Sequence, residues 1–169
     1  VFEHVAPGLR AAALAGGMVD DPAMVLGELL GARARRERIE ELVAEGIPVA
    51  VYGDPGWSHV AGDGFEYRGF AGHEFELPRV YAGSAINLDI HRAYQTDIVT
   101  MRVFDAMACG AFVLADHSTA LEELFVVGEE VATYRGAGNA APAVRAFLAE
   151  PEQARRIAEA GRRAVLERH

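Results

Sequence analysis

The sequence has 169 residues, a net charge of −9, 51% hydrophobic and 24% charged residues, which is typical of one globular domain with a real core. The acidic balance argues against nucleic-acid binding, which needs a local basic surface. All 16 basic residues are arginine, and the absence of lysine excludes Schiff-base chemistry, a Walker-type phosphate loop and a receiver-domain lysine. The single cysteine, Cys109, excludes a disulfide framework and indicates a reducing compartment, so we expect a cytoplasmic protein.

The ends of the chain and its one basic segment add little chemistry. No apolar run reaches the roughly 18 residues of a membrane span, and no signal-peptide pattern opens the chain. The basic run 33–38 is broken by Glu37 and indicates a solvated helix face. Because the chain begins abruptly and ends within a helical pattern, we expect a longer native protein. Residues 1–20 are interpreted as a segment that connects to a missing N-terminal domain.

From residue 21 onward the sequence predicts helices that alternate with strands. Asp21 as N-cap, Pro22 at the first helical position and Gly46 beyond the end predict a long first helix. Apolar runs and helical periodicity predict the other elements. The expected strands are 48–52, 65–67, 85–90, 111–115 and 130–134. The expected helices are 76–83, one through 103–108 that stops at Gly110, a short one with a capping box at Thr119 and Glu122, and two that close the chain.

This alternation predicts an α/β fold, a Rossmann-like parallel sheet with helices on both faces. We expect its strands to bury a set of apolar side chains, namely Val51, Ile86, Leu88, Val113 and Leu114. Ligands of such sheets bind beyond the carboxyl ends of the strands. Three segments meet that condition: 53–57 with Asp54, 90–97 with His91, Arg92 and Asp97, and 116–119 with His117 and Ser118.

A glycine pattern near the end of the chain, 136–141, matches the spacing of a dinucleotide fingerprint. That fingerprint needs a further strand with an acidic residue about 20 residues on, which binds the ribose. Only an amphipathic helix follows here. We therefore expect a surface loop.

The most informative segment is 97–116. Asp97 and Asp105 are carboxylates eight residues apart, and the second lies just before an Ala-Met-Ala-Cys-Gly helix end. The pair resembles the E-x(7)-E motif of retaining GT-B glycosyltransferases, with Asp at both Glu positions. Four further stretches resemble the spore-maturation, CgeB-like branch of glycosyltransferase group 1, and these are 51–57, 76–81, 86–88 and 102–105. The resemblance covers roughly residues 25–168.

The resemblance implies that residues 21–169 are the nucleotide-sugar-binding half of a GT-B glycosyltransferase, inactive alone because the N-terminal acceptor domain is missing. Asp105 would accept hydrogen bonds from the ribose, Asp97 would touch the transferred sugar and Arg102 would neutralise the diphosphate. Eight helical residues would separate the two carboxylates by about 12 Å. The diphosphate would lie at the helix N-terminus, where N–H groups favour anions. No metal is expected, because an Asp-x-Asp motif is absent. No cofactor is expected either, since the nucleotide-diphospho-sugar would be the donor substrate.

Most of these candidates also have a structural interpretation. Asp97 fits a helix N-cap as well as a sugar contact, and Arg102 fits an ion pair as well as a ligand. Asp105 fits a surface carboxylate as well as a ribose contact. Asn87, together with Asp89, occupies the polar side of an alternating strand, which is typical of an edge strand or of a binding site.

The candidates in the loops after the strands also have both a structural and a functional interpretation. His91 fits a solvated loop or a phosphate contact, and Ser118, like Thr119, fits a helix cap or an anion-binding turn. The Asp-for-Glu replacements and the missing lysine also favour an alternative function. In that alternative the chain is a degenerate GT-B-like domain that binds or interacts without turnover.

Overall fold

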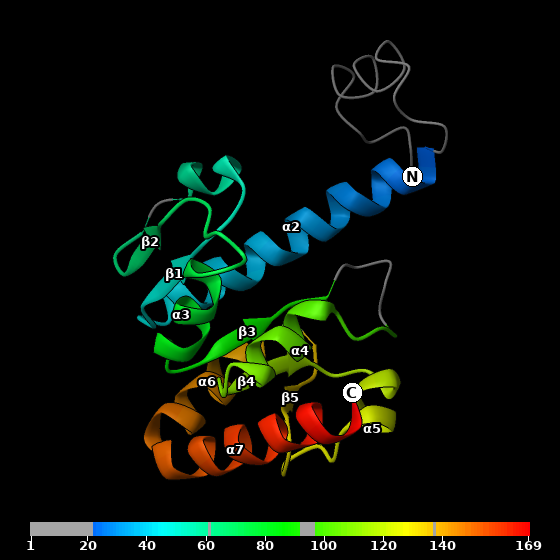
Figure 1. Cartoon of the computed structure of the whole chain (residues 1–169). Helices are drawn as coiled ribbons and strands as arrows, with labels where there is room; N and C mark the ends of the chain where they lie inside the picture. Colours follow the sequence, from blue (N-terminus) through cyan, green and yellow to red (C-terminus); the bar gives the residue numbers. More distant parts are fainter. Residues whose placement is uncertain (1–21, 61, 92–96, 137) are drawn as a thin grey trace.

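The computed structural model describes residues 22–60, 62–91, 97–136 and 138–169, and Figure 1 shows their arrangement. The expected connecting segment 1–20, the predicted N-cap Asp21 and the candidate Arg92 lie outside the described residues. Within the described part, five short strands form two parallel sheets that helices cover. The predicted α/β architecture with parallel strands is therefore confirmed. None of the helices in these ranges is long and apolar enough to cross a membrane.

The first helix, α2, spans Pro22–Ala44 and ends just before Gly46, whose φ of 73° suits glycine at the C′ position. Among the described residues, its second half supplies the apolar side chains that pack in the core. Ile39 and Leu42 are buried, whereas Leu30 in the first half is 46% exposed. Figure 1 shows the beginning of α2 extending away from the other elements.

The basic run of α2 agrees only in part with the predicted solvated face. Arg33 pairs with Glu37 on the exposed side, at 2.6 Å. Arg38 is buried instead, with its guanidinium 5.3 Å from the centre of the Tyr134 ring and Nη1 donating to the carbonyl of Gly136. The solvated interpretation is wrong for Arg38 because this side chain turns inward and joins α2 to the third strand of the larger sheet.

The strands divide into a pair and a trio. β1 (Val49–Val51) pairs with β2 (Phe65–Tyr67), and the short 3₁₀ helix η2 (Pro55–His59) lies between them in the chain. The second sheet has the order β3-β4-β5, formed by Asn87–Asp89, Val113–Asp116 and Ala132–Tyr134. Its register places Leu88 opposite Leu114, and Leu114 opposite Ala132. In this sheet β4 is central and β3 is an edge strand.

In the described part of the chain after β2 there are five helices, and all lie close to their predicted positions. They are α3 (Glu76–Gly83), α4 (Met101–Ala108), α5 (Thr119–Leu124), α6 (Ala140–Ala149) and α7 (Pro151–Arg168). The cap of α5 is one residue earlier than the predicted capping box. Ser118 Oγ accepts from Leu121 N–H, so Ser118 and not Thr119 is the N-cap.

Two hydrophobic clusters lie on opposite sides of β4, because successive side chains of a strand point to opposite faces. Phe112 and Leu114 belong to the cluster with α2, α6 and the first half of α7. Val113 and Ala115 belong to the cluster with α4, α5 and the end of α7. The three-stranded sheet is therefore covered on both faces.

The expected burial of apolar strand residues is confirmed for β4, whereas the expected residues in and beside β1 and β3 are only half-buried. Val113 and Leu114 are 4% and 0% exposed, but Val51, Ile86 and Leu88 are half-buried. The difference follows from strand position. β1 has a single partner strand and β3 is an edge, so each has a neighbour on one side only.

Candidate functional site

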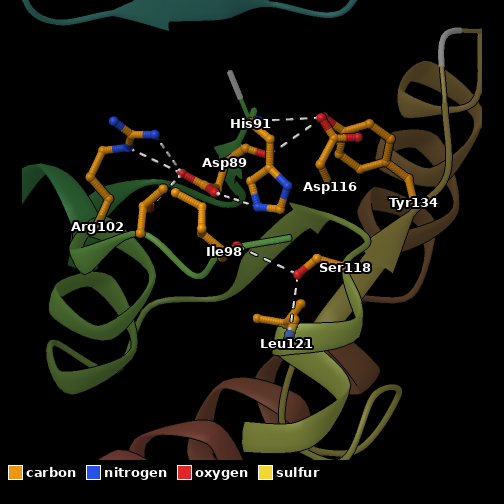
Figure 2. A network of polar contacts seen from close by, with 9 residues as sticks. Asp89, His91, Ile98, Arg102, Asp116, Ser118, Leu121 and Tyr134 are labelled. Carbon is orange, nitrogen blue, oxygen red and sulfur yellow. Dashed lines mark hydrogen bonds and ion pairs between the residues drawn. The ribbon is translucent and has the colours of Figure 1, made fainter. Parts of the chain in front are cut away.

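The carboxyl ends of β3, β4 and β5 bring polar side chains from three separate segments to one edge of the sheet. Asp89 ends β3, Asp116 ends β4 and Tyr134 ends β5. His91 follows β3 and Ser118 follows β4. Figure 2 shows that Asp89, His91, Asp116 and Tyr134, with Arg102 of α4, form one set of polar contacts, and that Ser118 makes a separate group of contacts with Ile98 and Leu121. This edge is where ligands of parallel α/β sheets bind.

Arg102 is held by a buried carboxylate of the neighbouring strand. Asp89 Oδ1 accepts from Arg102 Nη2 at 2.9 Å and Nε at 3.1 Å, and also from Thr100 Oγ1 at 3.1 Å. Asp89 is 4% exposed, whereas the Arg102 side chain is 57% exposed. The guanidinium therefore has one anchored edge and one solvent-facing side.

His91 is buried beside the same carboxylate. Its side chain is 7% exposed, and Nε2 lies 3.6 Å from Asp89 Oδ2. Neither of these two buried atoms has a hydrogen-bond partner among the described residues. An approach of about 0.5 Å would make a hydrogen bond between them. The main-chain N–H of His91 donates to Asp116 Oδ2 at 3.3 Å.

Tyr134, at the end of β5, also contacts Asp89. Its hydroxyl donates to the carbonyl of Asp89 at 3.5 Å. Burial raises the pKa of Tyr134 well above its usual range, and the neighbouring Asp116 carboxylate raises it further. The phenol therefore stays protonated and acts as a hydrogen-bond donor at neutral pH.

Asp97 lies at the start of α5 rather than at the start of α4. Its Oδ1 accepts from the N–H of Ala120 at 2.9 Å, in the first turn of α5. Ser118 Oγ, which caps the same helix, also donates to the carbonyl of Ile98 at 3.5 Å. Asp97 is therefore not an N-cap residue, because Thr100 caps α4 and Ser118 caps α5; its side chain instead accepts from the first turn of α5, which begins more than twenty residues later.

The geometric picture behind the Asp97–Asp105 spacing is wrong. α4 begins at Met101 with Thr100 as N-cap, so only the second half of the segment is helical. The expected rise of eight helical residues does not apply to it. Asp105 is exposed in α4, and its carboxylate adds to the raised pKa of Tyr81, which burial raises first.

His117 and Ser118 lie in the turn between β4 and α5. His117 Nε2 is 3.3 Å from Glu122 Oε1, and its side chain is 8% exposed. Arg135, which follows β5, reaches the same Glu122 oxygen at 3.4 Å. These contacts extend the polar edge from β3 across to β5.

Like the exposed Asp105, two further candidates, Asp54 and Asn87, lie outside this set of contacts in the described structure. Asp54 is exposed, and its Oδ1 accepts from the N–H of Gly56 as the N-cap of η2. Asn87 begins β3, at the opposite end of the strand from Asp89. Its amide donates to the carbonyls of Tyr81 and Phe112, so it joins the end of α3 to the start of β4.

Residues 33–169 match a family described as glycosyl transferase-like. The chain belongs to this family. It is similar in structure to sucrose-phosphate synthase from Thermosynechococcus elongatus, with a TM-score of 0.61 and 24% sequence identity. The match covers 78% of this chain and 38% of that one, so the chain spans well under half of that protein's length. No curated relative matches the chain.

Together with the parallel sheets, these findings confirm the predicted fold, a Rossmann-like half of the GT-B type. The loop that carries the glycine fingerprint is a surface loop in this glycosyl transferase-like domain, as predicted. Gly136 and Gly138 are exposed, and the N–H of Gly138 donates to Glu41 of α2. The loop therefore contributes to helix packing.

Several residues of the network are not singled out by the sequence alone. Asp89 stands out only as a polar residue in an alternating strand and Asp116 only as the first residue of the segment 116–119, whereas Thr100 and Tyr134 do not stand out at all. The available signal is positional. Each of Asp89, Asp116 and Tyr134 is the last residue of a predicted strand or the residue next to it, where parallel sheets present side chains to ligands.

Proposed function

We propose that this domain binds the donor of a GT-B glycosyltransferase, a nucleotide-diphospho-sugar, and that the acceptor is bound by a domain outside this chain. The proposal includes the CgeB-like branch, a reaction without a metal ion and a cytoplasmic location, which the free thiol of Cys109 supports. One observation carries the proposal, namely the position of Arg102 at the start of α4, in contact with Asp89 at the carboxyl end of β3.

The start of α4 has the features of an anion site. Thr100 is the N-cap, but its side chain makes no capping hydrogen bond to the helix. The first turn therefore lacks the side-chain acceptor that usually satisfies its N–H groups. Arg102, in this first turn, has a side chain that is 57% exposed. A diphosphate here would gain from both the helix N–H groups and the guanidinium.

The two carboxylates of the segment suit the neutral parts of the donor. Asp105 lies three residues after Arg102 and is exposed, so both side chains occupy the same side of α4. Its carboxylate would accept hydrogen bonds from the ribose hydroxyls. Asp97 already accepts one hydrogen bond from α5, and its other oxygen would meet the sugar. His117 and Ser118 extend this surface, whereas Asp54, Asn87 and His91 are weaker candidates.

The contribution of such a site to catalysis is electrostatic. Negative charge develops on the departing nucleoside diphosphate in the transition state, and fixed donors at that position lower its energy. Arg102 and the first turn of α4 supply those donors. The acceptor site belongs to the other half of a GT-B enzyme, so we expect no sugar transfer by this chain alone.

Calorimetric titration of ADP, GDP and UDP, each beside its nucleoside, tests the proposal. Arg102→Ala should weaken the diphosphates about tenfold to a hundredfold and leave the nucleosides unchanged, because it removes charge-assisted hydrogen bonds to phosphate. Asp105→Ala should weaken both ligand classes by removing ribose contacts. Matched controls are Arg163→Ala on α7 and Asp63→Ala near β2, which remove the same charges from exposed positions elsewhere.

The outcome separates the proposal from its alternative. If the wild-type chain binds none of these ligands at millimolar concentration, it is a degenerate GT-B-like domain without a working donor site. If Arg102→Ala binds diphosphates as well as wild type does, the donor site lies elsewhere. If Arg102→Ala weakens diphosphate binding but Asp105→Ala changes no affinity, the proposed ribose contact is wrong and the proposed diphosphate site is still supported.

A further inference from the structure

A buried carboxylate lies directly behind the proposed diphosphate site. Asp89 is 4% exposed, and its Oδ1 accepts from both Nε and Nη2 of Arg102. A buried carboxylate without a cationic partner would destabilise the folded protein, so Asp89 depends on its contact with Arg102. Asp89 is too buried to meet a ligand itself, and its described contacts to side chains are all within the network.

The geometry of the pair fixes the guanidinium. A guanidinium is planar and has five N–H donors. Both Nε and Nη2 donate to the same Asp89 oxygen, Oδ1, which holds this edge of the group toward the carboxylate. The remaining donors lie on the side away from Asp89. Because the Arg102 side chain is 57% exposed, those donors are available to a ligand.

Thr100 supports the same arrangement. A threonine at an N-cap position ordinarily accepts a hydrogen bond from its own helix. Here Thr100 Oγ1 donates to Asp89 Oδ1 instead, at 3.1 Å. The hydroxyl therefore fixes the carboxylate, and the helix N-terminus is left without a side-chain cap. Both consequences favour an anion at the start of α4.

We propose that Asp89 is a positioning residue for Arg102: it holds the guanidinium at the start of α4 so that the unbound donors face the diphosphate. This inference rests on the proposed function. Without Asp89 the long Arg102 side chain samples other rotamers, and its donors must be ordered when the ligand binds. Affinity for the diphosphate is then lower, and affinity for the nucleoside is unchanged.

Removal of Asp89 also removes a negative charge near a negative ligand. This second effect raises the affinity for the diphosphate, whereas loss of the anchor lowers it. Asp116 provides the matched control. It ends the neighbouring strand, and its Oδ2 accepts from the N–H of His91. No hydrogen bond or ion pair joins it to Arg102 in the described structure. Asp116→Asn therefore measures the charge effect without loss of the anchor.

The experiment is a double-mutant cycle between Asp89→Asn and Arg102→Ala, with Asp116→Asn beside it. The probes are inorganic pyrophosphate and whichever of ADP, GDP and UDP binds the wild-type chain most tightly, with its nucleoside. Asp89→Asn should weaken the diphosphate about threefold to tenfold when Arg102 is present. In the Arg102→Ala background it should leave affinity unchanged or raise it slightly, as Asp116→Asn should in either background.

A milder variant protects the test against misfolding. Thr100→Val removes the hydroxyl that fixes Asp89 and retains the shape of the side chain. It should lower diphosphate affinity about twofold to threefold without a change for the nucleoside. Retained nucleoside binding and a cooperative thermal transition show that each variant is folded.

The results distinguish this inference from the function on which it rests. If Arg102→Ala weakens diphosphate binding but Asp89→Asn strengthens it as Asp116→Asn does, Asp89 acts only through its charge and the positioning role is overturned. If Arg102→Ala has no effect, the proposed site fails first. Absence of diphosphate binding by the wild-type chain overturns both proposals.

Discussion

The two sheets of this domain differ in how deeply their residues are buried. None of the residues of β1 or β2 is buried, and exposed and half-buried side chains alternate along both strands. The first three residues of β4 are all buried, and helices cover both faces of the sheet to which it belongs. The helix between the two sheets in the chain, α3, has no buried residue.

The difference indicates which region can hold a ligand in a fixed geometry. A binding group is precise when packing and further hydrogen bonds fix its rotamer. Asp89, His91 and Ser118 are buried at the edge of the three-stranded sheet. Asp54, at the end of β1, is exposed and contacts its own turn. The comparison therefore favours a ligand site built mainly on β3, β4 and α4.

Substitution in the two sheets gives the largest expected contrast. Leu114 of β4 is 0% exposed, and Leu114→Ala should lower the free energy of unfolding by about 2–5 kcal/mol through lost burial and a cavity. Val51 of β1 is half-buried, so Val51→Ala should cost about 1 kcal/mol. Urea denaturation followed by circular dichroism measures both. Equal costs for the two variants would remove the distinction between the sheets.

Much of the fold follows from the sequence because local signals and packing agree. The predicted strand 65–67 and helix 76–83 coincide with β2 and α3, and Gly46 and Gly110 end helices as expected. The division into two sheets could not be predicted. Apolar periodicity indicates that a strand forms, but the choice of neighbouring strand depends on contacts between distant segments.

The site is less predictable, for a physical reason. The sequence identifies Arg102 and the ends of the strands, but not that Asp89 anchors Arg102 across thirteen residues. It offers Asp97 as a helix N-cap or a sugar contact, but does not show that its carboxylate contacts α5. Hydrogen bonds between separate segments depend on how a loop turns in space, and spacing along the chain does not determine that.

Alanine substitution of two helical glycines should change the stability of the protein by an intermediate amount. A Cβ at Gly161 of α7 would lie 2.8 Å from Met107 Cε and in conflict with the carbonyl of Glu130. Gly161→Ala should therefore destabilise the protein by about 1–3 kcal/mol, although alanine favours helix formation. Gly83→Ala in α3, with nothing within 4 Å, should be neutral or stabilising by up to about 1 kcal/mol. A stabilised Gly161→Ala variant would show that α7 packs less closely than described.

The smallest expected effect concerns two carboxylates that each pair with an arginine. The Arg168 guanidinium holds the pKa of Glu130 below its usual range, and Arg68 does the same to Glu66. Glu130 also accepts from the N–H of Val126, and its side chain is 15% exposed, against 60% for Glu66. The first pair ties the end of α7 to the turn before β5, whereas the second lies in solvent on β2.

Glu130→Gln should therefore cost about 1 kcal/mol at pH 7, and Glu66→Gln should have no measurable effect. Because the folded-state pKa of Glu130 is lowered, its contribution is complete above the ordinary pKa of a glutamate, near 4.3, and is lost as the pH falls through the lowered value. The difference between wild type and Glu130→Gln should accordingly shrink below about pH 4. Urea midpoints of both variants at pH 7, 5 and 3 measure it. A difference that persists unchanged at the lowest pH would assign the effect to packing of the side chain instead of its charge.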